Sequence, residues 1–100
     1  MRDKFVVRGR DEGVVFGLML DEENSLLTVG GPKIFRDQIA EVLELVFPEF
    51  DRTNIIVCYG RFRWLLRGVN KARWHDLLLA LDRSDKWSIQ PVKYFRRLMH

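Results

Sequence analysis

Residues 59–74, with the sequence YGRFRWLLRGVNKARW, carry the side chains best suited to bind a charged ligand. If residues 61–67 form a β-strand, their side chains alternate between its two faces. One face then carries Arg61, Arg63, Leu65 and Arg67, and the other carries Phe62, Trp64 and Leu66. Because a row of guanidinium groups is costly to bury, the arginine face is expected to meet solvent or a partner.

Arginine forks bind phosphates and carboxylates through paired hydrogen bonds, and a row of them gives salt-dependent affinity for a polyanion. Alternation places Tyr59 on the arginine side, where its ring can stack on a base. Arg8 and Arg10 extend the patch only if their strand is a neighbour, which the sequence does not establish. The predicted site for nucleic acid or another anionic partner comprises Tyr59, Arg61, Arg63, Arg67, Lys71, Arg73, Arg96 and Arg97. Nucleic acid is the leading ligand, and an acidic protein surface or a solvated, self-paired arginine face are the alternatives.

The remaining reactive residue types form no catalytic or cofactor motif. Residues 30–33, GGPK, open a helix, but both the P-loop spacing and G-x-G-x-x-G are absent. His75 and Asp76 are neighbours on a predicted helix and therefore point apart. Cys58 lies in an apolar run and is expected to be a small core residue. The histidines and the cysteine lack metal-ligand spacing, so we predict a protein that is not an enzyme and holds neither metal nor cofactor.

Length and composition indicate one domain spanning residues 1–100. The apolar share of 47% and charged share of 31% are typical of folded proteins. No apolar run approaches the roughly 20 residues needed to cross a bilayer, and the N-terminus does not resemble a secretory signal. A single cysteine suits a reducing compartment, so we expect a cytoplasmic protein without membrane contact.

Charge is distributed unevenly along the chain. Residues 1–51 hold 6 Lys and Arg against 11 Asp and Glu, a net −5. Residues 52–100 hold 11 against 3, a net +8. Such an asymmetry is typical of a chain whose basic half meets an anionic partner, unless the two halves pair internally.

The elements that must position the arginines follow the order β-β-β-α-β-β-α. Residue patterning predicts strands at 3–9, 14–20, 26–29, 54–59 and 61–69, one helix between Pro32 and Pro48, and a second at 70–82 with Asn70 as its N-cap. Residues 87–95 fit an edge strand, but Val92, Phe95 and Leu98 or Met99 also fit a short helix that begins at Pro91. We favour a short strand followed by a helical turn. The expected fold is α+β, a mostly antiparallel sheet of about five strands with two helices on one face.

A second function remains open. Residues 14–20 are apolar on both faces, as in a central strand covered on both sides or a strand at a second interface. A small protein-interaction factor, such as an inhibitor, immunity protein or adaptor, fits a compact chain of this kind, and it can self-associate through its acidic and basic halves. The fold class hosts many functions and does not decide between these hypotheses.

Overall fold

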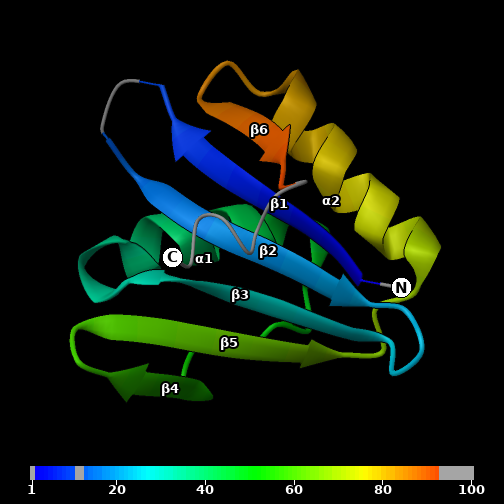
Figure 1. Cartoon of the computed structure of the whole chain (residues 1–100), viewed down its shortest axis with the longest axis horizontal. Helices are drawn as coiled ribbons and strands as arrows, with labels where there is room; N and C mark the ends of the chain where they lie inside the picture. The colour runs from blue at the N-terminus through cyan, green and yellow to red at the C-terminus, as the bar shows by residue number, and fades with distance from the viewer. Residues whose placement is uncertain (1, 11–12, 93–100) are drawn as a thin grey trace.

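Nine short elements make up the part of the chain described by the computed structural model, residues 2–10 and 13–92 (Figure 1). In chain order they are β1 (Arg2–Gly9), β2 (Val15–Asp21), β3 (Leu26–Pro32), a 3-10 turn (Lys33–Phe35), α1 (Arg36–Val46), β4 (Ile55–Cys58), β5 (Arg61–Arg67), α2 (Lys71–Arg83) and β6 (Trp87–Pro91).

The strands form one antiparallel sheet in the order β4-β5-β3-β2-β1-β6. Both helices cover the same face of this sheet and lie behind it in the view of Figure 1. The α+β class and the two helices on one face are therefore as predicted. The described residues hold six strands instead of about five, because Trp87–Pro91 pairs with β1 as an edge strand. Pro91 ends that strand, a position where its missing N–H is tolerated.

The core lies between the sheet and the helices. Alternate residues of β2, β3 and β5 point into it, with Trp64 and Phe16 among the largest buried side chains. Each helix contributes one apolar stripe, represented by Leu43 of α1 and Leu77 of α2. The Trp64 indole N–H donates to the backbone carbonyl of Arg52 at 3.1 Å, so its polar atom is satisfied.

Asn70 caps α2 as predicted. Its side-chain oxygen accepts a hydrogen bond from the backbone N–H of Arg73 at 2.9 Å. This bond satisfies one of the free N–H groups at the start of the helix.

The prediction that Cys58 is a core residue is wrong. Cys58 is exposed, because β4 is an edge strand and pairs only with β5. The predicted strand at 54–59 is also too long at its end, since Tyr59 lies in the turn to β5. The helical turn expected after the C-terminal strand falls in residues 93–100, outside the described residues.

Candidate binding face

Arg61, Arg63 and Arg67 project from β5 on the side of the sheet that the helices leave uncovered. Buried and exposed residues alternate along the whole strand, which confirms the alternation predicted from the sequence. All three arginines are exposed, and none forms an ion pair or side-chain hydrogen bond with a residue that the structure describes. Their charge is therefore available to a partner.

Cationic side chains also line the other side of this face, which we call the open face. The register places Arg8 opposite Val15 and Lys4 opposite Met19, so β1 presents both cations on the open face. Arg8 is exposed. Because β1 and β5 are three strand spacings apart, the two basic borders are separated by roughly 14 Å.

An open groove of about 560 Å³ lies between these borders. That volume falls within the roughly 300–1,000 Å³ of typical ligand sites. Its open-face lining consists of Lys4, Val6, Val15, Gly17, Met19, Thr28, Gly30, Pro32, Arg61, Arg63 and Val92. The middle of the groove thus holds two glycines, apolar side chains and Thr28, with Lys4 on its β1 side and Arg61 and Arg63 on its β5 side.

The sequence analysis did not predict the middle of the groove, between its two basic borders. The signal was the run of residues 14–20, apolar on both faces and interrupted by Gly17. In the structure this strand is central, with Val15, Gly17 and Met19 half-buried on the open face. The pattern predicted that both faces of the strand are apolar. It did not predict that the neighbouring strands add a second glycine and two basic borders.

Lys71 and Arg73 have partners within the fold. Lys71 lies 3.5 Å from a carboxylate oxygen of Glu22. Arg73 forms an ion pair with Glu49, and its guanidinium carbon lies 4.7 Å from the centre of the Phe47 ring. Both residues belong to α2, on the helix-covered side of the sheet (Figure 1), and are therefore not part of the open face.

Internal pairing accounts for part of the charge asymmetry of the chain. Arg52 donates to Glu44 at 2.8 and 2.9 Å and lies 3.6 Å from Asp37. Among the described residues, every ion pair joins a cation of the basic second half to a carboxylate of the acidic first half. The three arginines of β5 belong to the same basic half and form a row without ion pairs to described residues.

The ion pairs and turns around the β4 end of the sheet lower the pKa of two carboxylates. The pKa of Glu49 is lowered mainly by a hydrogen bond from its own backbone N–H and next by a hydrogen bond from the Arg73 side chain. The hydroxyl and backbone N–H of Thr53 donate to Asp51 at 2.6 and 3.0 Å, and these bonds lower the pKa of Asp51. The hydrogen bond with Glu44 raises the pKa of Arg52, which stays charged.

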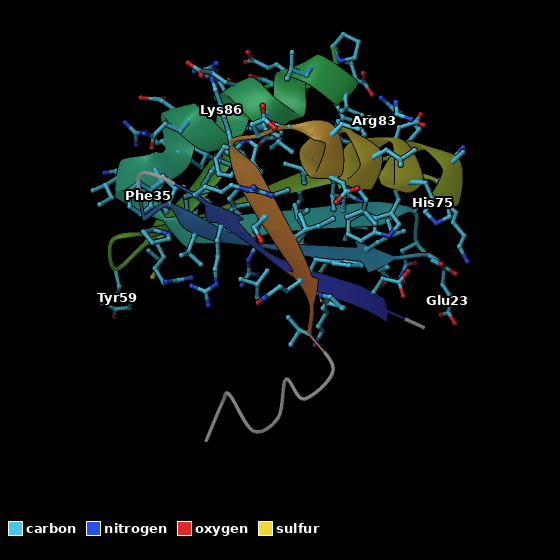
Figure 2. The ribbon with its side chains drawn as sticks, turned by 90° about the horizontal axis from the view of Figure 1, so that it is seen from above. Glu23, Phe35, Tyr59, His75, Arg83 and Lys86 are labelled. Atoms are coloured by element: carbon cyan, nitrogen blue, oxygen red, sulfur yellow. The ribbon has the colours of Figure 1, made fainter. Side chains whose placement is uncertain are left out.

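Tyr59 occupies the tip of the β4–β5 hairpin and is 99% exposed. Figure 2, in which both helices lie above the sheet, shows its side chain extending downward, toward the side of the open face. Tyr59 and Gly60 have φ angles of 52° and 76°, the pair of positive values that a tight two-residue hairpin turn requires. Arg96 and Arg97, the other predicted contributors, lie outside the described residues.

No three His, Cys, Asp or Glu side chains of the described residues converge as metal ligands do. No helix among them is long and apolar enough to span a bilayer.

No family model matches the chain, and no significant match is found among curated proteins or solved structures. The function must therefore be inferred from the geometry and charge of the open face.

Proposed function

We propose that this protein is a non-enzymatic binding module that engages nucleic acid through the basic open face of its sheet. The observation that carries the proposal is the row formed by Arg61, Arg63 and Arg67, exposed and without ionic partners among the described residues. Carboxylates of the first half of the chain form ion pairs with other cations, and these three guanidinium groups remain exposed to solvent. Arginine forks bind phosphates through paired hydrogen bonds, and a row of them suits the repeated phosphates of a nucleic acid.

The shape of the face supports a ligand that lies along it. Basic borders on β1 and β5 flank a groove whose lining is mostly apolar, so a polyanion can place charge on the borders and apolar surface between them. Two open faces packed against each other would bring like charges together, which disfavours face-to-face pairing of two copies.

Binding of labelled single- and double-stranded DNA and RNA, followed by fluorescence anisotropy, tests the proposal. Affinity should fall steeply between about 50 and 200 mM salt, as expected when phosphate contacts release counterions. The double variant Arg61→Glu/Arg63→Glu should abolish binding at the low-salt end. Adding Arg67→Glu should have no further effect once binding is lost.

The matched control is Arg83→Glu/Lys86→Glu, which changes the net charge equally. Both residues are exposed, and Figure 2 places them on the helix side of the molecule. This control should keep most of its affinity. Absence of binding to every oligonucleotide at low salt would refute the proposal. If poly-glutamate binds as tightly as the oligonucleotides and its binding depends on the same arginines, the face would instead be assigned to an acidic polypeptide.

A second candidate function, self-association, is favoured by the edge strand β4. β4 pairs on one side only, contains no charged residue or proline, and exposes Ile56 and Val57. Exposed strand edges normally carry such protective residues, because an unprotected edge pairs with another chain.

Sedimentation velocity of Val57→Lys tests this second candidate. A dimer formed through β4 should persist at high salt, because backbone pairing and apolar contacts are not screened, and Val57→Lys should dissociate it. The control Leu79→Lys replaces an equally exposed apolar residue of α2 and should leave the dimer intact. A monomeric wild-type protein at all concentrations would exclude self-association.

A further inference from the structure

The centre of the groove is a floor of bare backbone. Gly17 of β2 lies directly opposite Gly30 of β3, and Val6 and Arg63 flank this glycine pair in the same cross-strand row. Two adjacent strands thus present no side chain at this level of the open face. The groove therefore reaches the backbone at its centre while Arg63 stands at its edge.

Side chains close this floor along the strand direction. Val15 and Met19 lie two residues before and after Gly17 and share its face. Successive side chains on one face of a strand are roughly 7 Å apart. The floor is therefore a small area bounded along β2 by the apolar side chains of Val15 and Met19.

The fold itself does not require glycine at position 17. A Cβ atom there would meet only the carbonyl oxygen of Gly30, at 3.8 Å, which is an ordinary contact. At Gly31, by contrast, a Cβ atom would lie 3.1 Å from the carbonyl oxygen of Val15 and 3.2 Å from the Cβ of Phe16. Gly31 is needed for packing, whereas glycine at 17 weakens a central strand and keeps the groove open.

We propose that this floor seats one unpaired base of a single-stranded nucleic acid, whose neighbouring phosphates bind Arg61 and Arg63. The inference rests on the proposed function and narrows it from nucleic acid in general to single strands. In a duplex the faces of the bases are covered by stacking, so only phosphates could reach the groove. An unpaired base can lie flat on the floor between apolar side chains.

The residues around the floor suit an unpaired base. The guanidinium of Arg63 adjoins the floor and can stack on a base or donate to its edge. In the turn that leads into β5 at Arg61, the exposed ring of Tyr59 offers a stacking surface for a second base. The floor adjoins Arg63 across the sheet, and Tyr59 lies two residues before Arg61 along the chain.

Three probes of one sequence separate base contacts from phosphate contacts. They are a single-stranded oligonucleotide, its duplex, and the same strand with abasic sites. Wild-type protein should bind the intact single strand about tenfold more tightly than either of the others. Gly17→Val, which fills the floor, should lose this preference. Ser88→Val adds the same side chain to the open face on β6, outside the groove lining, and should retain it.

The outcomes distinguish this inference from the proposed function. If wild-type protein binds the three probes equally, or if Gly17→Val keeps the preference, the floor is not a base site. Arginine-dependent, salt-sensitive binding would then still support the proposed function. If no probe binds, both proposals fail. Circular dichroism and thermal unfolding of Gly17→Val should show a native fold at least as stable as wild type, so that lost affinity reports on the groove.

Discussion

At the scale of single residues, Tyr59 is a poor choice for its turn and a good choice for stacking. A left-handed backbone is unfavourable for tyrosine, and asparagine before glycine is preferred in a turn of this kind. Tyr59→Asn should therefore raise the free energy of unfolding by up to about 1 kcal/mol. If the ring stacks on a base, the same change should weaken binding of single strands by about tenfold.

Urea unfolding and anisotropy on the same preparation measure both effects of Tyr59→Asn. Tyr59→Phe keeps the ring and the backbone strain, so it should match wild type in both measurements. A Tyr59→Asn variant that is more stable and binds as well as wild type would exclude Tyr59 from the site.

Asp51 makes the fold sensitive to acid. Because hydrogen bonds from Thr53 lower its pKa in the folded state, its carboxylate stabilises the fold at neutral pH, and this contribution is lost as the pH falls through the lowered pKa. Asp51→Asn should be less stable than wild type at pH 7, and the difference should vanish in acid. Asp76→Asn, at an exposed position on α2, is the control and should follow wild type. Urea midpoints from pH 7 to about pH 2 measure both.

Sequence predicts single residues well where only the local period matters. The exposure of Arg61, Arg63 and Arg67 follows from alternation along one strand. The exposure of Cys58 does not, because an apolar run looks the same whether its strand is central or at an edge. The pairing of Arg73 with Glu49 likewise depends on two elements meeting in space, which no local pattern encodes.

At the scale of elements, the N-cap of α2 is a local signal with a measurable energy. Asn70→Ala removes the acceptor for the Arg73 N–H and should lower the free energy of unfolding by about 1 kcal/mol. Asn70→Ser keeps an acceptor and should restore most of it. Urea unfolding measures both variants. An unchanged midpoint in Asn70→Ala would mean that water replaces the cap without loss.

The order of the elements was predictable, but the order of the strands in the sheet was not. Turn residues and apolar periods mark where each strand and helix lies. Nothing in those periods states that β6 joins β1, or that β2 and β3 lie between β1 and β5. That arrangement creates the groove, because it sets Gly17 beside Gly30 and keeps the basic borders apart. The arginines of the candidate site could thus be predicted from the sequence, whereas the glycine floor of the groove could not.

At the scale of the whole molecule, ion pairs between the acidic and basic halves leave a surplus of positive charge on one face. The formal net charge of +3 understates this surplus, because the described carboxylates that form ion pairs do so with Lys71, Arg52 and Arg73 and not with the row on β5. Like charges on one face repel each other, so a polyanion that binds them should stabilise the fold.

Thermal unfolding should therefore report on binding by the whole molecule. A single-stranded oligonucleotide at about 100 times its Kd should stabilise the native state by about 2.7 kcal/mol, which raises the Tm of a domain of this size by roughly 10–20 °C. Arg61→Glu/Arg63→Glu should show no such rise, although its Tm without ligand should equal or exceed that of wild type because repulsion is relieved. Arg83→Glu/Lys86→Glu should rise as wild type does. Equal shifts in the two double variants would mean that the oligonucleotide binds elsewhere than the open face.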